Sequence, residues 1–455
     1  MGIRAHWLKR HNLLQIYELF GKFFISLHHN FSFFTEKGIH AVRKTQQKPM
    51  TTEEYITLHR DDDVRRLALK SQPGVDMHFA LQQIDGWQRA RTKLPMWAAR
   101  DGVLYPPHVS MEQCSSEQTA VYKRDSICRE SPEEKKNTRF IDLTGGFGVD
   151  FSYMSQGFGE AIYVERQEHL CATARHNFSV LGMDNARVVC GCCEPFLQSL
   201  PSEAEWREKT TIYLDPARRD TNGRKTYAIT DCTPDFLSLL PLLREKARRV
   251  IVKLSPMLDH REACRLAEGV SEVHIVSVKN ECKELVLVVE DGEKPVKVVC
   301  VNDGDIFECG LSQDSDGGKA MLRITDACPS VGDTLVVPNA SIMKSGNFAE
   351  FTARFGVAAL DRMSHLFVTK NADSTAVFPG RSFRILAVST MNKKELRRVL
   401  AETVGESARA NVAVRNFPMS ADELRKRLRL KDGGEIYVFG TTILGEHRIV
   451  VCARR

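Results

Sequence analysis

The chain has 455 residues, of which 42 % are hydrophobic and 27 % are charged. This balance is typical of a soluble globular protein with several domains, and it excludes a disordered, collagen-like or multi-span membrane chain. The formal net charge of +6 is unevenly distributed. Residues 1–50 hold 8 Lys/Arg and 2 Asp/Glu, residues 381–455 hold 16 and 8, and the remainder holds 40 and 48. Two basic ends therefore flank an acidic body.

The 13 cysteines are scattered and odd in number, which predicts free thiols in a reducing, cytoplasmic compartment. The densest cluster is Cys190-Gly191-Cys192-Cys193. Because no second pair follows at metal-ligand spacing, we expect no metal site.

Residues 1–50 look unlike the rest and are interpreted as an N-terminal extension outside the fold. Their apolar stretch, 13–34, is interrupted by charged and His residues, so it is too polar for a membrane span and a poor signal-peptide core. A membrane-surface amphipathic segment is the alternative. After Met50, Thr51 and two acids predict the start of a helix.

Residues 51–130 form a helical N-terminal region, as their apolar stripes at helical spacing indicate. Within it, Ser115 and Gln118 have the spacing of a capping box at the start of a helix.

Residues 131–291 alternate short β-branched runs with helix-length segments, the pattern of a parallel doubly wound sheet. The predicted parallel strands are 139–143, 161–164, 187–190, 211–214 and 250–253. The last two strands, 273–279 and 284–289, are joined through Asn280 with no room for a helix, so they should pair antiparallel. A parallel sheet closed by such a hairpin indicates a seven-stranded methyltransferase sheet rather than a dinucleotide-dehydrogenase sheet.

Residues 292–380 predict a small β-rich, ferredoxin-like domain with a connecting helix from Ser341 through Phe355. Residues 381–455 predict a small α+β domain in the order strand, helix, strand, helix, strand, strand, with Ser420 and Glu423 capping the second helix. The expected fold class is therefore α/β: a seven-stranded Rossmann-like sheet with a helical N-terminal region and small α+β C-terminal domains.

Two motifs follow the first and second strands, where ligands of parallel sheets bind. The turn Asp142-Leu-Thr144-Gly-Gly146-Phe-Gly148 would let the backbone approach a ligand closely, although a plain βα turn or a nucleotide site would use the same glycines. Glu165, 23 residues after Asp142, ends the second strand and could accept both hydroxyls of a ribose. Its alternative role is a helix cap.

The third motif, Asp215-Pro216-Ala217-Arg218, ends the fourth strand. An Asp carboxylate and a free backbone carbonyl can accept both hydrogens of a planar amino group and direct its lone pair toward an electrophile. The alternative is an ordinary turn from strand to loop.

A family resemblance is carried by these three motifs and by the segments 113–120, 253–259, 280–284 and 338–344. Over roughly residues 51–455 the chain resembles the bacterial class I S-adenosylmethionine-dependent methyltransferases with a THUMP-like C-terminal domain, which are related to the cap guanine-N2 methyltransferase branch. The resemblance implies S-adenosylmethionine as the cofactor and RNA, methylated at a base nitrogen, as the substrate.

Carried over by position, the resemblance assigns the cofactor to Asp142, Thr144, Gly146, Gly148, Asp150, Glu165 and Cys192, and the acceptor to Asp215, Pro216 and Arg218. Two positions depart from the family pattern. In the family, the third strand often ends in an Asp that contacts the adenine amine. Cys192 and its neighbours occupy that place here, so a backbone group or Glu194 would have to make the adenine contact. Arg218 occupies the position of an aromatic residue that usually stacks on the base. A guanidinium group can stack on a base or pair with a phosphate.

The basic C-terminal domain is the predicted RNA-docking surface, through Lys393, Lys394 and Arg397 on one helix and Arg425 and Arg427 on the other. A solvated helix face is the alternative for such a run. Two other functions stay open: a non-catalytic nucleotide- or RNA-binding module on a methyltransferase-like fold, and an NAD-dependent dehydrogenase, against which the closing hairpin and Asp215-Pro216 count.

Overall fold

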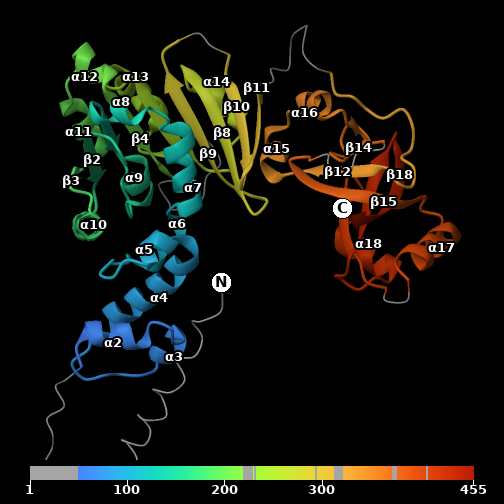
Figure 1. Cartoon of the computed structure of the whole chain (residues 1–455), viewed down its shortest axis with the longest axis horizontal. Helices are drawn as coiled ribbons and strands as arrows, with labels where there is room; N and C mark the ends of the chain where they lie inside the picture. Colours follow the sequence, from blue (N-terminus) through green and yellow to red (C-terminus); the bar gives the residue numbers. More distant parts are fainter. Residues whose placement is uncertain are drawn as a thin grey trace, which may run out of the picture. The chain divides into compact units, whose positions relative to one another are not determined.

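The computed structural model describes residues 50–218, 229, 232–292, 295–311, 321–370, 377–405 and 408–455, and every structural statement below concerns these residues. The chain divides into two units, Met1–Met50 and Thr51–Arg455. The predicted N-terminal extension lies outside the described residues. Figure 1 shows the second unit, which contains two large sheets.

The first part of this unit is helical. Its elements are α2 (Thr52–His59), α3 (Val64–Leu67), α4 (Met77–Lys93), α5 (Pro95–Ala98), α6 (His108–Gln113), α7 (Glu117–Tyr122), the π-helix η1 (Lys123–Ile127) and α8 (Pro132–Lys136). Thr51 caps α2 and forms the full capping box with Glu54, which confirms the predicted helix start. The predicted cap at Ser115 is wrong by one residue, because Ser116 caps α7 by accepting from the N–H of Thr119.

The larger sheet has nine strands in the order β11-β10-β8-β9-β7-β4-β1-β2-β3. Its strands are β1 (Arg139–Asp142), β2 (Glu160–Glu165), β3 (Ala186–Cys190), β4 (Thr210–Leu214), β7 (Arg249–Leu254), β8 (Val270–Val278), β9 (Glu281–Glu290), β10 (Lys297–Asn302) and β11 (Asp305–Gly310). The first five of these pair parallel, and β9 runs antiparallel between β7 and β8. Seven of the nine strands thus correspond to the five parallel strands and the closing hairpin predicted from the sequence.

Both faces of this sheet are covered, which explains the continuous apolar runs of its strands. On β1, for example, Phe140 belongs to a core cluster with α9 (Val149–Met154) and α10 (Glu168–Val180), and the adjacent Ile141 belongs to a cluster with helices of the other face. The helices of that other face are α11 (Cys193–Ser199), α13 (Phe236–Lys246) and α14 (His260–Leu266). The short elements α12 (Ala204–Glu208), β5 (Ala217–Arg218) and β6 (Cys232–Thr233) complete this part.

The hairpin β8–β9 turns at Lys279 and Asn280, whose φ values of 51° and 61° lie in the left-handed region. Two successive residues with positive φ form the tight turn that matches the twist of antiparallel strands, and Asn tolerates this conformation well. The predicted antiparallel closure is therefore confirmed. The sheet nevertheless continues past residue 291, because β10 pairs parallel with β8 and β11 pairs with β10. The prediction of a seven-stranded sheet ending there missed these two strands, since their composition resembles that of the β-rich segment that follows.

The second sheet has seven strands in the order β13-β14-β12-β15-β18-β17-β16. Its strands are β12 (Thr334–Pro338), β13 (Ala358–Ala359), β14 (Phe367–Thr369), β15 (Gly380–Ser389), β16 (Asn411–Arg415), β17 (Ile436–Ile443) and β18 (Glu446–Arg454). Because β12 pairs with β15, the segments 292–380 and 381–455 share one sheet. The single helix predicted from Ser341 is in fact two, α15 (Ala340–Ser345) and α16 (Phe348–Phe355), interrupted at Gly346 with a φ of +66°.

Two helices cover one face of this second sheet. α17 (Lys393–Thr403) and α18 (Ala421–Leu428) contribute Leu396, Val399 and Leu424 to a core cluster with Val438 and other strand residues. Ser420 and Glu423 form the predicted capping box of α18. The strand and helix order predicted for 381–455 is confirmed. None of the helices in the described part of the chain has both the length and the apolar content that crossing a membrane requires.

Candidate functional site

The carboxyl ends of the parallel strands lie along the same side of the nine-stranded sheet. After β3, at the end of the sheet, the chain crosses back to place β4 on the other side of β1. Such a reversal of strand order opens a crevice beyond the carboxyl ends of the strands, where open α/β sheets bind ligands. Asp142 ends β1, Glu165 ends β2, and Asp215 directly follows β4. The structure therefore brings the three predicted motifs to one edge.

The glycine-rich turn leaves room for a ligand to approach its backbone closely. Gly146 and Gly148 have φ values of +55° and +85°, which other residues rarely adopt. A Cβ on Gly145 would lie 2.1 Å from a ring carbon of Tyr163, so this position must be glycine to admit the ring beneath the turn. A Cβ on Gly146 would meet nothing closer than the Thr144 carbonyl at 3.8 Å, so this glycine faces open space. The Tyr163 hydroxyl donates to the Gly146 carbonyl and holds the turn in place.

Glu165 is a buried acid tied to the same turn. One of its carboxylate oxygens accepts from the N–H of Gly146 at 3.0 Å, and the other accepts from the N–H of Gln167 at 2.8 Å. The side chain is 7 % exposed. Because each carboxylate oxygen has two lone pairs, both oxygens keep an acceptor site for a ligand.

A chain of hydrogen bonds links the first motif to the third. Asp142 Oδ1 accepts from the N–H of Thr144 at 2.9 Å, and the Thr144 hydroxyl oxygen accepts from the N–H of Asp215 at 2.6 Å. Burial raises the pKa of Asp142 well above its usual value, and the nearby carboxylates of Asp150 and Asp215 act in the same direction. Thr144 thus fixes the backbone of Asp215 relative to the glycine-rich turn.

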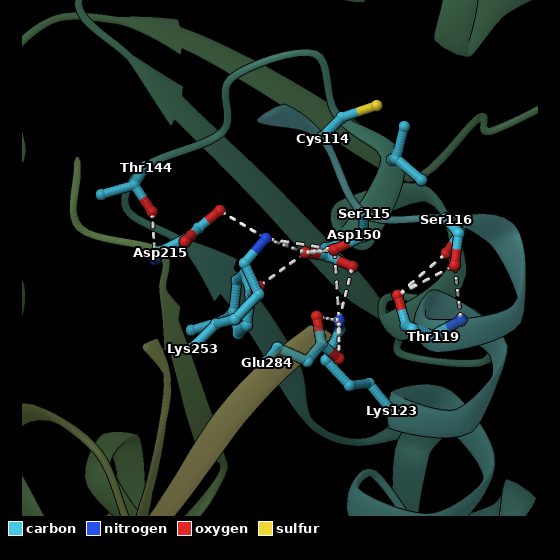
Figure 2. A network of polar contacts seen from close by, with 12 residues as sticks. Cys114, Ser115, Ser116, Thr119, Lys123, Thr144, Asp150, Asp215, Lys253 and Glu284 are labelled. Atoms are coloured by element: carbon cyan, nitrogen blue, oxygen red, sulfur yellow. Dashed lines mark hydrogen bonds and ion pairs between the residues drawn. The ribbon is translucent and has the colours of Figure 1, made fainter. Parts of the chain in front are cut away.

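Behind Asp215 lies a buried network of charged groups from five separate segments (Figure 2). Its members are Ser115, Lys123, Asp150, Tyr213, Asp215, Lys253 and Glu284. Asp215 differs from the rest, because 37 % of its side-chain surface is exposed and the side chains of its charged partners are at most 10 % exposed. The network is therefore a buried cluster with one carboxylate at its open side.

Lys253, on β7, has three partners for its three N–H groups. Its Nζ lies 2.5 Å from Asp215 Oδ2, 3.2 Å from Asp150 Oδ2 and 3.1 Å from the Ser115 hydroxyl. Although burial alone would lower the pKa of Lys253, the carboxylates of Asp215, Asp150 and Glu284 raise it well above its usual value. These carboxylates therefore favour the protonated form of Lys253 next to Asp215.

Lys123, in the first turn of η1, is fully buried and equally well satisfied. Its Nζ contacts both carboxylate oxygens of Glu284 at 2.7 and 2.8 Å, Asp150 Oδ1 at 3.1 Å and the Ser115 hydroxyl at 3.2 Å. The Ser115 hydroxyl donates to Asp150 Oδ2 at 2.7 Å and accepts from both lysines, so its one proton and two lone pairs are all used. The helical N-terminal region thereby supplies two members of the cluster.

Asp150, in the first turn of α9, is the centre of the cluster. Burial alone would raise its pKa, but the ammonium groups of Lys123 and Lys253 and the hydroxyl of Tyr213 hold that pKa below its usual range. The pKa of Asp215 is raised by burial, an effect that Lys253 opposes. When the carboxylates of Asp150, Asp215 and Glu284 and the ammonium groups of both lysines are all charged, the cluster has one more negative than positive charge.

Five members of the cluster were not predicted from the sequence as site residues: Ser115, Lys123, Tyr213, Lys253 and Glu284. A signal existed for Lys253 and Glu284, since a charged residue within an otherwise apolar strand needs a buried partner. The sequence predicts Ser115 as a helix cap, because Ser115 and Ser116 are adjacent and the local pattern does not show which of them precedes the helix.

The three remaining residues predicted for the cofactor and acceptor sites are Cys192, Pro216 and Arg218. Cys192 is exposed and stands at the start of α11 without a side-chain cap hydrogen bond. Pro216 is buried and leads into β5, and the side chain of Arg218 lies outside the described residues, so its predicted role stays a prediction. Over the described ranges, no group of three or more His, Cys, Asp or Glu side chains is arranged to hold a metal ion.

The predicted RNA-docking residues lie on the two helices that cover the second sheet. Lys393, Lys394, Arg397 and Arg427 are exposed. Arg425 is half-buried and engaged by acids of its own domain, Asp422 at 2.6 Å and Asp432 at 3.7 Å. Its charge is therefore less available to a ligand than the sequence suggests.

Comparison with known proteins supports this description. Residues 380–454 match the family model of the THUMP domain-like type, and residues 335–376 match that of a ferredoxin-like domain. A provisionally assigned methyltransferase from Porphyromonas gingivalis W83 is 29 % identical, with a TM-score of 0.74 over 89 % of this chain and 97 % of that one. The chain thus has the fold of a class I methyltransferase with a THUMP-like C-terminal domain.

Other solved structures match smaller parts of the chain. A SAM-dependent methyltransferase from Agrobacterium tumefaciens is 16 % identical, with a TM-score of 0.26 over 38 % of this chain and 59 % of that chain. An O-methyltransferase from Bacillus cereus in complex with SAH is 13 % identical, with a TM-score of 0.30 over 42 % and 94 %. No curated protein sequence matches the chain.

Proposed function

We propose that this protein is an S-adenosylmethionine-dependent methyltransferase that methylates a base nitrogen of RNA, and that its C-terminal domain docks the RNA. The observation that carries the proposal is the placement of Asp215. Thr144 holds its backbone, Lys253 holds one carboxylate oxygen, and within the described residues Oδ1 receives no hydrogen bond. A partly exposed carboxylate held in this way beyond the carboxyl end of β4 is suited to receive a hydrogen-bond donor of a substrate.

The residues at the strand ends fit the cofactor. Open space beside Gly146 would admit its methionine end, and the free acceptor sites of Glu165 would receive its ribose hydroxyls. When bound, S-adenosylmethionine supplies an electrophilic methyl group on a positively charged sulfur. The excess negative charge of the buried cluster, in a region of low dielectric, favours a cationic ligand nearby.

Asp215 has two roles in this proposal. Its Oδ1 accepts one N–H of the acceptor amine, which directs the nitrogen lone pair away from the carboxylate and toward the methyl group. Once the acceptor nitrogen has taken up the methyl group, it would have a proton to lose. The Asp215 carboxylate is the base within reach of that proton, and it passes the proton on to solvent through its exposed side.

The C-terminal domain supports RNA as the substrate. Its exposed basic side chains stand on two helices of one layer, so their charges lie on the same side of the second sheet. Clustered cations bind phosphates independently of sequence, which suits a domain that docks a structured RNA while the crevice selects the base.

The experiment that tests the proposal is transfer of an isotope-labelled methyl group from S-adenosylmethionine to total RNA isolated from a strain that lacks the gene. We expect label in one nucleoside of one RNA, mapped by digestion and mass spectrometry. Label in protein or small molecules alone would overturn the RNA assignment. If calorimetry detects no binding of S-adenosylmethionine, the enzyme assignment itself fails.

A further inference from the structure

We infer that Lys253 is a positioning residue of the transfer reaction, which fixes the Asp215 carboxylate for the acceptor and is itself held by Asp150 and by Ser115 of the helical N-terminal region. This inference rests on the proposed function and adds to it a residue, and a segment of the chain, on which the reaction depends.

The first step is the direction in which Lys253 acts. An ammonium group has three N–H donors, and Asp150 and Ser115, which are both buried, engage two of them. Asp215 Oδ2 lies 2.5 Å from the same Nζ and forms an ion pair with it. Two buried contacts thus hold the ammonium group that pairs with the half-exposed carboxylate.

The second step is the use of the remaining oxygen. With Oδ2 on Lys253 and the backbone N–H on Thr144, Asp215 is restrained at one carboxylate oxygen and at its main chain. Oδ1 is then the oxygen that faces a substrate. Rotation of the carboxyl group would otherwise weaken the hydrogen bond to the acceptor amine, and a misplacement of about 1 Å can cost about 100-fold in rate.

The third step explains why the N-terminal region matters. Ser115, in the segment between α6 and α7, contacts both lysines, and Lys123, at the start of η1, occupies Glu284 and the other oxygen of Asp150. Figure 2 shows the two ammonium groups meeting around Asp150 and Ser115. Lys123 pairs with Asp150 and Glu284 and does not contact Asp215, so it stabilises the cluster that surrounds Lys253.

The decisive experiment compares the full-length variants Lys253→Met and Lys123→Met with wild type. Each removes a buried ammonium group, but only Lys253 contacts Asp215. We would follow the titration of Asp215 by 13C NMR of labelled aspartate carboxyl groups, with Asp215→Asn to assign the signal. The charged or titratable groups that influence Asp215 are Lys253, Asp150, Lys123, Asp142 and Tyr213.

We expect Lys253→Met to raise the titration midpoint of Asp215 by about 1 to 3 pH units, because a carboxylate loses the cation beside it. Lys123→Met should move that midpoint much less. In methyl transfer to the RNA substrate, Lys253→Met should lower the rate by about 100-fold and shift the acid side of the pH profile upward, with the affinity for S-adenosylmethionine within about 3-fold of wild type. Lys253→Arg, which keeps the charge, should recover part of the rate.

An unchanged midpoint in Lys253→Met, or an equal shift in Lys123→Met, would overturn the inference. A merely structural role would lower affinity and rate together and leave the pH profile in place. If Lys253→Met does not fold, Lys253→Met/Asp150→Asn removes one charge of each sign from the cluster, and the same titration decides. If wild type transfers no label to RNA, the proposed function fails, and the titration still shows whether Lys253 controls Asp215.

Discussion

The hydroxyl oxygen of Thr144 accepts a hydrogen bond from the backbone N–H of Asp215 at 2.6 Å, across 71 residues of sequence. The bond joins the turn after β1 to the loop after β4, so the proposed cofactor and acceptor sites share one side chain. A shift of either loop is therefore transmitted to the other.

Thr144→Val removes this hydroxyl and keeps the shape of the side chain. We expect methyl transfer to fall by about 10-fold, as for the loss of roughly 1.4 kcal/mol, because the N–H of Asp215 loses its partner and the loop is no longer held. Thr144→Ser, which keeps the hydroxyl, is the matched control and should stay close to wild type. Rates measured at saturating S-adenosylmethionine test this, and equal loss in both variants would contradict a role for the hydroxyl.

Glu165→Gln tests the cofactor end of the crevice. The amide has one acceptor oxygen where the carboxylate has two, so it cannot hold the turn and a ribose together. We expect the Kd for S-adenosylmethionine, measured by calorimetry, to rise about 10- to 100-fold, since hydrogen bonds to a charged group contribute about 1.5–3 kcal/mol. Glu160→Gln, at the opposite end of β2, is the control. Similar affinities in both variants would show that Glu165 does not bind the cofactor.

Lys123→Met tests the energetics of the buried cluster. Asp150 and Glu284 would each lose a buried cation, and breaking such a pair costs about 3–5 kcal/mol of unfolding free energy. The exposed pair of Lys283 with Glu281 offers a control, because Lys283→Met should change stability by about 0–1 kcal/mol. Denaturant unfolding measures both. A small effect of Lys123→Met would show that solvent enters the cluster.

Charge reversal tests the docking surface better than deletion does. Removing residues 381–455 would take β15 and β18 from the second sheet and leave β12 without its partner β15, so the remainder would not keep its fold. We expect the triple reversal of Lys393, Lys394 and Arg397 to Glu to weaken RNA binding and to lower the slope of log affinity against log salt by about 2, while cofactor affinity stays unchanged.

The matched control for this reversal is the same change at Arg65, Arg66 and Lys70, which are exposed in the helical N-terminal region. Filter binding or fluorescence anisotropy at several salt concentrations separates the two variants. If both triple reversals weaken RNA binding equally, the result would contradict a docking surface on the C-terminal domain.

The strand ends could be predicted from the sequence because they depend on local patterns. An apolar run, a glycine-rich turn and an acid after a strand each occupy a few consecutive residues, and they place Asp142, Glu165 and Asp215 correctly at one edge. The resemblance to a methyltransferase family added the expected cofactor and the expected roles of these three residues.

The buried cluster could not be predicted in this way, because its members are residues 115, 123, 150, 213, 215, 253 and 284, which meet only in the folded chain. Lys253 stands in an apolar strand, where its charge indicates a partner but does not identify Asp215. β10 and β11 were missed for a similar reason, since pairing with β8 depends on tertiary contacts rather than on composition.

The most direct test of the central claim measures cofactor affinity and methyl transfer together for wild type and Asp215→Ala. We predict that wild type labels RNA from the gene-deficient strain, and that Asp215→Ala binds S-adenosylmethionine with a Kd within about 3-fold of wild type but transfers methyl at least about 100-fold more slowly. Equal loss of affinity and transfer, or an unchanged rate, would contradict the assignment of Asp215 to the acceptor.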